Sequence, residues 1–489
     1  MTHPTLDDIY KVPLGLLTDL YQLTMAYGYW RQGTSERPAV FQLTFRKMPF
    51  GGGYAIAAGL EPALDYLTRL RFSGDDLSYL ATLTGRDGGR LFPDEFIEHL
   101  ATFRFTCDVD AIPEGTVVHA HEPLVRVTGP LLQAQLVETA LLNIINFQTL
   151  IATKAARVVD AARGDSVLEF GLRRAQGIDG GLSASRASYL GGCHATSNVL
   201  AGRLFGIPVR GTHAHSWVMS HDSELESFLA YAEAMPNNCV FLVDTFDTLK
   251  GVEHAITVGH RLREAGHELA GIRLDSGDLA ELSQRARAML DAAGFPDAAV
   301  VASNDLDETL IESLKHQGAR INIWGVGTKL VTAYDQPALG GVYKLSALRS
   351  GDGKAWDYKV KLSEQPAKVS VPGILQVRRY LDDKGLPIGD VIFDEATGCP
   401  ADATLIDQMD ATYRKTLSGP WVELLEPQLR QGQRVAAAIP LSAARDRTSA
   451  QVAKLSPGLR RFLNPHRFPV GLEASLWQRR HDLVLAARA

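Results

Sequence analysis

Short apolar segments alternate with longer amphipathic segments through the middle of the chain. The short segments are rich in β-branched residues, as buried strands are, and they recur at spacings of roughly 25 to 40 residues, which suits βα units. They comprise residues 167–170, 207–211, 240–243, 271–274, 299–302 and 321–324. The intervening segment 278–295 places its apolar residues along one helical face. The pattern therefore predicts six successive parallel βα units.

An α/β chain of this kind folds either as a barrel or as a doubly wound sheet. A dinucleotide-binding sheet carries GxGxxG directly after its first strand, and residues 171–176 (GLRRAQ) contain no such motif. We therefore expect an α/β barrel, in which the reactive side chains gather where the strands run out into the following loops.

The segments on either side of the repeating units have different patterns. Residues 18–31 predict an amphipathic helix, with Tyr21 outside the apolar stripe that Leu20, Leu23, Tyr27 and Trp30 form. Residues 104–130 predict short strands with turn signals, residues 352–395 predict strands and turns, and residues 421–489 predict helices.

These changes of pattern predict three regions. We expect an N-terminal α+β domain over residues 1–136 and an α/β-barrel catalytic domain over residues 137–345. The remainder, residues 346–489, is expected to form a mixed and helical region that packs on the N-terminal domain.

Charge and cysteine content exclude several classes of protein. The 489 residues carry a formal net charge of −6 without a long basic run, which argues against a nucleic-acid partner. The four cysteines are far apart and lack CxxC spacing, so we expect free thiols in the cytoplasm. The N-terminus shows no apolar signal sequence, and the apolar stretch 139–153 is too short and too polar to cross a membrane.

Polar, aromatic or glycine residues follow every expected strand. They are Phe170 and Arg173 after the first, Thr212 and His215 after the second, Asp244 after the third, Arg273 and Asp275 at the fourth, Ser303 and Asn304 after the fifth, and Gly325, Gly327 and Thr328 after the sixth. In a barrel these ends share one face, so we expect the side chains to form one site.

Each feature has an ordinary structural alternative. Asp278 and Asp305 fit helix N-caps, and GVGT at 325–328 fits a tight turn. Arg46 and Lys47, ahead of three glycines, are either phosphate ligands or a solvated strand end.

The same residues also fit a site. Glycines before a helix bind phosphate, paired carboxylates hold Mg²⁺ or ribose hydroxyls, and arginines bind carboxylates or phosphates. Together they suggest a phosphorylated ribose, a metal, an anionic aromatic molecule and a histidine.

Several ordered blocks of the chain resemble the nicotinate phosphoribosyltransferase family. They are LLTDLYQLTMAYGYW, FRKMPFGGGYAIAAGL, EFGLRRAQGIDGGLSASRASYLGG, GTHAHSW, RLDSGDL, GVGTKLVT and GGVYKL. The resemblance covers residues 16–345, and KLSEQPAKVSVPG and KLSPGLRRFLNP extend it more weakly to about residue 476.

The resemblance implies an incomplete or irregular TIM-like barrel of the type II phosphoribosyltransferase kind. The implied reaction joins nicotinate to phosphoribosyl pyrophosphate, giving nicotinate mononucleotide and pyrophosphate, the first step of NAD salvage from nicotinate. The family couples this reaction to ATP hydrolysis, with Mg²⁺, through transient phosphorylation of the histidine that matches His215. His213 does not match that histidine.

The resemblance also assigns roles to individual residues. Tyr21 and Phe170 match an aromatic sandwich around the pyridine ring, with the tyrosine supplied by the partner subunit of a homodimer. Thr212 and Arg273 match nicotinate contacts, and Asp244 and Asp275 match an acidic pair near ribose and metal. The remaining matches bind the phosphoribosyl group (Ser303, Asn304, Gly325, Gly327 and Thr328) or pyrophosphate (Arg46, Lys47 and Arg173).

Three alternatives remain open. One is a nicotinamide or quinolinate phosphoribosyltransferase, but Asn198 stands where nicotinamide-using relatives have an aspartate that reads the carboxamide, and an asparagine does not repel nicotinate. Another is a barrel that binds nucleotides without catalysis. The third is a phosphosugar aldolase or isomerase, for which Lys329 and Lys344 are the nearest candidate lysines.

Overall fold

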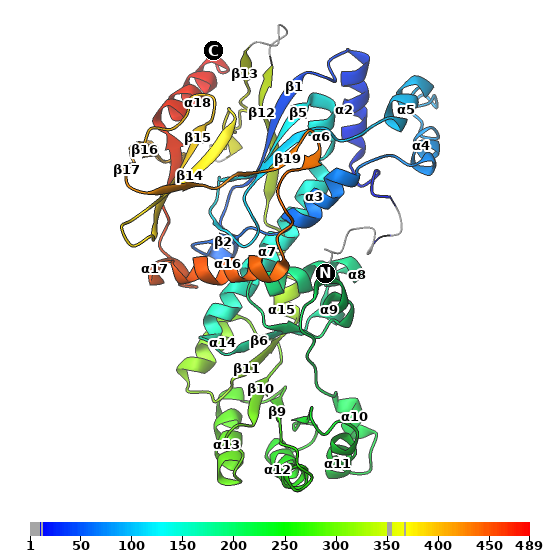
Figure 1. Ribbon diagram of the computed structural model, residues 1–489, viewed down its shortest axis with the longest axis vertical. Helices are drawn as coiled ribbons and strands as arrows, with labels where there is room; N and C mark the ends of the chain where they lie inside the picture. The colour runs from blue at the N-terminus through cyan, green and yellow to red at the C-terminus, as the bar shows by residue number, and fades with distance from the viewer. Residues whose placement is uncertain (1–9, 11–12, 350–354, 366–367) are drawn as a thin grey trace. The chain divides into compact units, whose positions relative to one another are not determined.

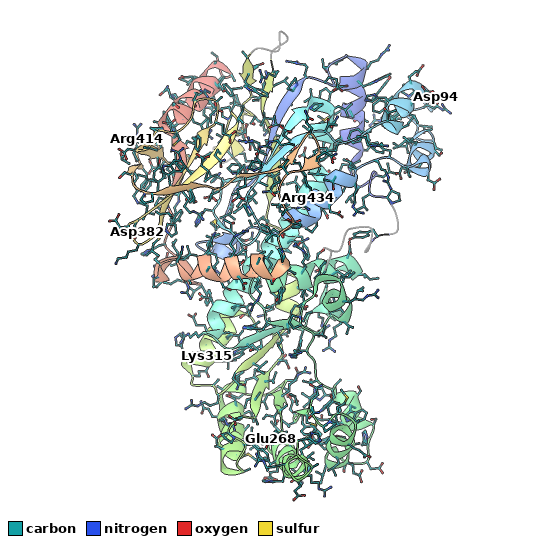
Figure 2. All side chains as sticks on the ribbon, in the orientation of Figure 1. Asp94, Glu268, Lys315, Asp382, Arg414 and Arg434 are labelled. Carbon is teal, nitrogen blue, oxygen red and sulfur yellow. The ribbon has the colours of Figure 1, made fainter. Side chains whose placement is uncertain are left out.

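The computed structural model describes residue 10 and residues 13–349, 355–365 and 368–489 (Figure 1). The chain forms two compact units. Unit 1 combines residues 1–150 with residues 338–489, and unit 2 comprises residues 151–337. The charged side chains of Asp94 and Asp382 lie at the edge of the drawing in Figure 2. Within the described residues, every helix is too short or too polar to span a bilayer.

Unit 2 contains a six-stranded parallel sheet in the order β7-β6-β11-β10-β9-β8. Its strands are β6 (Ser166–Glu169), β7 (Ala195–Thr196), β8 (Val240–Leu242), β9 (Gly271–Leu274), β10 (Ala299–Ala302) and β11 (Ile323–Val326). The last strand, β11, pairs in parallel with the first, β6, from Ile323 opposite Ser166 to Val326 opposite Glu169. A parallel sheet whose last strand returns to its first curls into a barrel, so the expected α/β-barrel fold is confirmed.

The barrel is open at one place. Val209 forms a single parallel bridge with Thr196, next to β7. In the described chain, no backbone pairing joins residues 207–210 to β8. Instead, the Leu242 N–H donates a hydrogen bond to Nε2 of His213 at 3.2 Å. The His213 ring therefore takes the place of a sheet hydrogen bond at the opening.

Helices connect the strands of unit 2. They are α8 (Gly177–Leu190), α9 (Val199–Phe205), α10 (His215–Met219), α11 (Glu224–Ala234), α12 (Thr248–Glu264), α13 (Leu279–Ala292), α14 (Glu308–His316) and α15 (Thr328–Val331). Asp278 caps α13, as the sequence predicts, by accepting hydrogen bonds from the N–H groups of Ala280 and Glu281. The prediction that Asp305 caps a helix is wrong, because α14 begins later and Asp307 accepts from the Leu310 N–H at 2.7 Å.

Three strand predictions need correction. Residues 207–211 form only the bridge at Val209, where the Thr196 N–H donates to the Pro208 carbonyl and the Arg210 N–H donates to the Thr196 carbonyl, both at 3.0 Å. The last strand is predicted at residues 321–324 but lies two residues later, at Ile323–Val326, because these are the residues that pair with β6. Strand β7 is not predicted, because its two residues, Ala195 and Thr196, are too few to show a periodic pattern.

Unit 1 is built around two larger sheets and a pair of short strands. The seven-stranded sheet contains β1 (Pro38–Phe45), β3 (Asp108–Ala111), β5 (Pro123–Pro130), β12 (Gly341–Arg349), β13 (Trp356–Tyr358), β19 (Glu426–Arg430) and β20 (Gln433–Arg434). The six-stranded sheet contains β14 (Leu375–Leu381), β15 (Pro387–Asp394), β16 (Ala403–Ile406), β17 (Arg414–Leu417), β18 (Trp421–Glu423) and β21 (Val470–Glu473). The short pair is β2 (Ala55–Ile56) with β4 (Val117–Val118).

Distant parts of the sequence share these sheets. Strand β12 pairs with β1, and β19 pairs with β3. Residues 421–434, which the sequence predicts as helical, therefore form strands β18, β19 and β20 because sheet edges from other parts of the chain pair with them. Helical structure follows in α16 (Leu441–Ala453), α17 (Pro457–Arg460) and α18 (Ala474–Ala486).

The helices of the N-terminal part of unit 1 agree better with the sequence pattern. The helix predicted over 18–31 is confirmed as α2 (Leu20–Arg31). The others are α3 (Leu60–Arg69), α4 (Gly74–Leu80), α5 (Asp94–Ala101) and α6 (Leu131–Leu136), and α7 (Glu138–Ala162) contains the division between the units.

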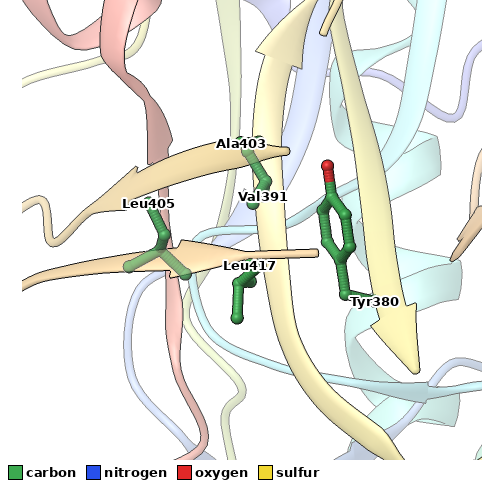
Figure 3. Packing of buried hydrophobic residues seen from close by; sticks show 5 residues of the cluster. All are labelled: Tyr380, Val391, Ala403, Leu405 and Leu417. Carbon is green, nitrogen blue, oxygen red and sulfur yellow. The ribbon is translucent and has the colours of Figure 1, made fainter. Parts of the chain in front are cut away.

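The six-stranded sheet of unit 1 buries a compact apolar cluster (Figure 3). Tyr380, Val391, Ala403, Leu405 and Leu417 come from four different strands and are at most 1% exposed. Burial of such side chains contributes roughly 1.5 to 3 kcal/mol each, so this cluster holds β14 to β17 together.

Buried arginines of unit 1 are paired with carboxylates. Arg379 forms an ion pair with Asp390 at 2.6 Å, and Arg126 forms one with Asp110 at 2.9 Å. Burying an unpaired charge costs several kcal/mol, so these partners allow the guanidinium groups to lie in the interior.

The hydrogen bond to His213 predicts a pH dependence of stability. Burial lowers the pKa of His213 to about 4 from its usual 6.5. Between these two pH values the unfolded chain binds a proton at His213 and the folded chain does not, so this group reduces stability as the pH falls. In His213→Gln, the midpoint of thermal unfolding should therefore fall less steeply between pH 7 and pH 4.5. His260→Gln, at an exposed position of α12, should retain the steep profile, and identical profiles for all three proteins would contradict the prediction.

Candidate active site

Arg273, in strand β9, is the centre of a polar cluster in unit 2. Its Nε donates a hydrogen bond to Ser303 Oγ at 2.8 Å, after β10. Its Nη1 donates to Thr212 Oγ1 at 2.9 Å, and its Nη2 donates to Asp275 Oδ1 at 3.0 Å. One guanidinium group thus joins residues from the ends of β9 and β10 and from the segment after the Val209 bridge, and the sequence predicts all four residues as members of one site.

Phe170 lies beside this cluster. The guanidinium carbon of Arg273 is 5.9 Å from the centroid of the Phe170 ring. A Cβ atom at Gly325 would lie 2.7 Å from that ring, and one at Gly327 would lie 3.1 Å from the Phe170 carbonyl oxygen. The two glycines therefore make room for Phe170, which places an aromatic face next to a cation.

His215 is the first residue of α10 and belongs to the same cluster. Its Nδ1 lies 3.1 Å from Thr245 Oγ1, and its Nε2 lies 3.8 Å from Asp275 Oδ2. The side chain is 41% exposed, so a reactant can approach it. His213 differs from it, because it is buried and hydrogen-bonded at the barrel opening.

Thr245 is a member of the cluster that the sequence analysis does not single out. It lies directly after Asp244, at the end of β8. Its position next to a predicted acidic residue is the only signal in the sequence, because a threonine after a strand is common in any fold.

Asp244 and Asp275 are joined through the backbone. Asp244 Oδ2 accepts hydrogen bonds from the Asp275 N–H at 2.8 Å and from Ser276 Oγ at 2.6 Å. Its other oxygen, Oδ1, is buried and has no hydrogen-bond partner among the described residues. A buried carboxylate oxygen without a partner is unfavourable, so Asp244 is suited to receive a cation or a hydroxyl group.

The described residues contain no cluster of three or more His, Cys, Asp or Glu side chains that is arranged to hold a metal ion. Two carboxylates are nevertheless sufficient for Mg²⁺, which is commonly held by one or two carboxylates together with substrate phosphates and water. The free Oδ1 of Asp244 therefore fits this ion, and the site does not resemble a zinc centre.

The predicted phosphate-binding residues lie on neighbouring loops of unit 2. Ser303 is buried at the end of β10, and Asn304 and Asp305 follow it with φ angles of 93° and 26°. Such angles are uncommon outside glycine and cluster at functional sites. Thr328 begins α15 and is partly exposed, and the next residue, Lys329, forms an ion pair with Asp307 at 2.6 Å.

Arg173 and Asn198, two further predicted site residues of unit 2, do not hydrogen-bond to Arg273. Arg173 is exposed in the short helix η2 (Leu172–Arg174). Asn198 is 1% exposed, caps α9 through the Ala201 N–H, and donates to Ser185 Oγ at 3.2 Å. Its place in the fold is thus that of a helix cap, and its role in specificity stays a prediction.

Three further predicted residues belong to unit 1. Tyr21 lies on α2 and is 47% exposed, and partial burial followed by the nearby Glu138 carboxylate raises the pKa of its hydroxyl. Arg46 and Lys47 directly follow β1, and burial lowers the pKa of Arg46. Among the described residues, neither Arg46 nor Lys47 has an acidic partner.

Family models match most of the chain. The model for the nicotinate phosphoribosyltransferase N-terminal domain matches residues 16–146, the model for the nicotinate phosphoribosyltransferase family matches residues 166–368, and the model for its C-terminal domain matches residues 375–480.

Individual relatives agree with these matches. The chain is 51% identical over 372 residues to nicotinate phosphoribosyltransferase of Bacillus subtilis, covering 76% of this chain and 74% of that protein. It is 43% identical over 451 residues to a Mycobacterium tuberculosis nicotinate phosphoribosyltransferase, covering 90% and 93%. It is 36% identical over 520 residues to the human enzyme of that name, covering 94% and 95%.

Solved structures show the same relationship. The crystal structure of human nicotinic acid phosphoribosyltransferase superposes with a TM-score of 0.83 at 33% identity, covering 95% of this chain and 99% of that chain. A nicotinate-nucleotide pyrophosphorylase from Pyrococcus furiosus shares the fold, with a TM-score of 0.66 at 19% identity over 90% of this chain and 96% of that one. The chain therefore belongs to the nicotinate phosphoribosyltransferase family.

Proposed function

We propose that the protein joins nicotinate to phosphoribosyl pyrophosphate, giving nicotinate mononucleotide and pyrophosphate, as the first step of NAD salvage from nicotinate. The observation that carries this proposal is the position of Arg273, which lies beside Phe170 and is held by Thr212, Ser303 and Asp275. A fixed cation next to an aromatic face suits an aromatic carboxylate.

In this proposal, nicotinate stacks on Phe170 and its carboxylate accepts hydrogen bonds from Arg273 and Thr212. Tyr21 of the partner subunit covers the other face of the ring, in a homodimer with shared active sites. The exposed apolar residues Leu17, Leu20 and Met25 accompany Tyr21 at the start of α2, which supports a role of this surface in subunit contact. Asn198 avoids the repulsion that an aspartate would exert on the substrate carboxylate.

The substitution occurs at C1 of the ribose. The bond from C1 to the pyrophosphate oxygen breaks, and the pyridine nitrogen forms the new bond to C1. Positive charge develops on the sugar as pyrophosphate departs, and the carboxylates of Asp244 and Asp275 stabilise it. Asp244 and Asp275 would hold Mg²⁺, which would neutralise part of the charge that develops on the departing pyrophosphate.

The phosphate groups contact other residues in this proposal. Ser303, Asn304, Gly325, Gly327 and Thr328 bind the phosphoribosyl group, through backbone N–H groups and hydroxyls. Arg46, Lys47 and Arg173 bind pyrophosphate through their charges.

ATP acts as a co-substrate at His215. A ring nitrogen of His215 attacks the γ-phosphorus, the bond between that phosphorus and the β,γ-bridging oxygen breaks, and ADP leaves. Water later cleaves the nitrogen–phosphorus bond and releases phosphate. Thr245 and Asp275 orient the ring during these steps, as their distances of 3.1 and 3.8 Å from its two nitrogens allow.

The protein is expected to act in the cytoplasm. Cys107, Cys193, Cys239 and Cys399 form no disulfide bond among the described residues, and three of them are buried. Free cysteines are typical of a reducing compartment, and this supports the proposed location.

The substrate is tested by supplying nicotinate, nicotinamide or quinolinate together with phosphoribosyl pyrophosphate and Mg-ATP. Arg273 favours an anionic ring, and Asn198 does not repel the substrate carboxylate as an aspartate would. The kcat/KM for nicotinate should therefore exceed the kcat/KM for nicotinamide and for quinolinate by a factor of at least about 100. Chromatography of the mononucleotide product measures this. Preference for nicotinamide would reject the substrate assignment, and binding without turnover of any ring would favour a non-catalytic nucleotide-binding barrel.

The role of His215 is tested by His215→Ala. Since the proposed phosphoryl acceptor is lost, ATP should no longer stimulate nicotinate mononucleotide formation, and no acid-labile phosphate should transfer from ATP to the protein. His260→Ala, on α12, removes an exposed histidine and should keep both properties. Full ATP stimulation of the His215→Ala protein would show that another residue accepts the phosphate.

The metal role of Asp244 is tested by Asp244→Asn. Loss of one negative charge at the partnerless oxygen should raise the Mg²⁺ concentration for half-maximal activity on the order of tenfold, about 1.4 kcal/mol. Asp247→Asn is the matched control, because Asp247 caps α12 and asparagine caps helices equally well. An unchanged Mg²⁺ requirement in the Asp244→Asn protein would place the ion elsewhere.

A further inference from the structure

Lys329, in α15, forms an ion pair with Asp307 that the proposed reaction does not use. Its Nζ lies 2.6 Å from Asp307 Oδ2, and the two side chains are 28% and 12% exposed, so water screens the pair only in part. The hydrogen bond to Asp307 raises the pKa of Lys329, so this amine keeps its proton at neutral pH. A lysine held in this way is unsuited to Schiff-base chemistry, which needs a neutral amine.

Asp307 is held at both of its carboxylate oxygens. Its Oδ1 accepts a hydrogen bond from the Leu310 N–H at 2.7 Å, which caps α14, and its Oδ2 contacts Lys329. Burial opposes ionisation of this carboxyl group, but the hydrogen bonds from Lys329 and Leu310 lower its pKa. Asp307 therefore carries a full negative charge at neutral pH and connects α14 with α15.

The next residue, Glu308, connects the start of α14 with α7. Its Oε2 lies 2.6 Å from Lys154 Nζ, and its Oε1 lies 2.8 Å from Arg157 Nε. All three side chains are at most 5% exposed. Removing one partner of a buried ion pair is strongly destabilising, so the start of α14 is firmly attached to the interior of unit 2.

The Lys329 ion pair joins two segments that contain residues proposed to bind the phosphoribosyl group. One segment connects β10 to α14, and the other leads from β11 into α15. The pairing of β10 with β11 ends at Ala302 opposite Trp324. Beyond that point, no backbone hydrogen bond of the described chain joins residues 303–307 to residues 327–329. The side chain of Lys329 bridges the two segments instead.

The segment between β10 and α14 has an unfavourable backbone conformation. Asn304 and Asp305 have φ angles of 93° and 26°. Such angles are strained in residues other than glycine and persist only where the surrounding structure holds them. Ser303 is held on one side by Arg273, and Asp307 is held on the other side by the cap and the ion pair. The contact with Lys329 therefore helps to keep this segment in its strained shape.

We propose that Lys329 and Asp307 are positioning residues, whose ion pair fixes the two segments relative to each other and thereby sets the affinity for the phosphoribosyl group. The inference rests on the proposed function, which supplies the ligand that both segments bind. A site that is held in its binding geometry before the ligand arrives binds it more tightly. Since the pair acts through the two segments and not on the reacting atoms, its loss should weaken binding of phosphoribosyl pyrophosphate and spare nicotinate.

The first experiment uses Asp307→Asn, which separates the two roles of this residue. Asparagine caps helices as well as aspartate does, but it does not balance the charge of Lys329. The KM for phosphoribosyl pyrophosphate should rise by about tenfold, with kcat and the KM for nicotinate within about twofold. Steady-state kinetics measure this. Lys329→Met should have the same effect, and Lys329→Arg, which keeps the charge, should raise the KM much less.

The variant that combines Asp307→Asn with Lys329→Met shows whether the two residues act as a pair. Both substitutions remove the same contact, so the combined rise in KM should not exceed the larger single rise. Glu268→Gln removes an exposed ion pair with Arg263 in the same unit and should leave the KM unchanged. Single effects that multiply, or single variants with a KM for phosphoribosyl pyrophosphate within twofold of the unmodified protein, would overturn the proposal.

Amide hydrogen exchange provides a second readout that needs no turnover. In ligand-free Lys329→Met, exchange in residues 303–307 should be several-fold faster, although the substitution lies in the other segment. If that variant does not fold, phosphoribosyl pyrophosphate with Mg²⁺ should slow exchange in both segments of the unmodified protein. Unchanged exchange in the variant, or protection of only one segment in the unmodified protein, would overturn the proposal.

Calorimetry of phosphoribosyl pyrophosphate binding, without nicotinate, separates this inference from the proposed function. Weaker binding by Asp307→Asn in a protein that does not use nicotinate would retain the positioning pair and reject the proposed function. Nicotinate turnover combined with equal affinities of the Asp307→Asn and unmodified proteins would retain the proposed function and reject the positioning pair. A protein that binds no phosphoribosyl pyrophosphate would reject both.

Discussion

The guanidinium group of Arg273 connects the parts of the candidate active site. It hydrogen-bonds to Ser303 and Asp275, which follow β10 and β9, and to Thr212, which follows the Val209 bridge at the barrel opening. Asp275 is in turn linked to Asp244 through its own N–H group. Because charge-assisted hydrogen bonds are short and directional, one cation determines the relative positions of the hydroxyls and carboxylates. The carboxylate of Asp275 balances much of its charge, and the face toward Phe170 remains beside an aromatic ring.

The opening of the barrel gives the two histidines of the HAHS block different environments. His213 closes the gap to β8 through the Leu242 N–H, and His215 lies beside Thr245 and Asp275. Ala214 between them is the N-cap of α10, so His215 begins a helix whereas His213 lies in the non-helical segment before it. Burial keeps His213 neutral, whereas His215 remains accessible for chemistry. A buried structural histidine and a reactive one can therefore lie two positions apart in sequence.

The arginines of unit 1 fall into two groups, those with a carboxylate partner and those without one among the described residues. Arg126, Arg379 and Arg479 are neutralised by carboxylates within the fold. Arg126 and Arg379 also donate to the carbonyl oxygens of Leu375 and Val117, which are distant in sequence. Arg46 and Arg480 are only partly buried and lack such partners in the described chain.

The sequence by itself determined the periodic part of the fold and most members of the candidate site. The strands at Gly271–Leu274 and Ala299–Ala302 agree with their apolar segments residue for residue, because a buried parallel strand needs a continuous apolar run. Phe170, Arg273, Asp275 and Ser303 are brought together because strand ends share one face of a barrel, and Thr212 joins them through its hydrogen bond to Arg273. Features without a periodic pattern were decided by tertiary structure. The two-residue strand β7, the strands within 421–434 and the contact of Thr245 with His215 all depend on partners far away in sequence. A local pattern records which residues are buried, but only the folded chain determines which neighbour completes a sheet edge, a hydrogen bond or a charge.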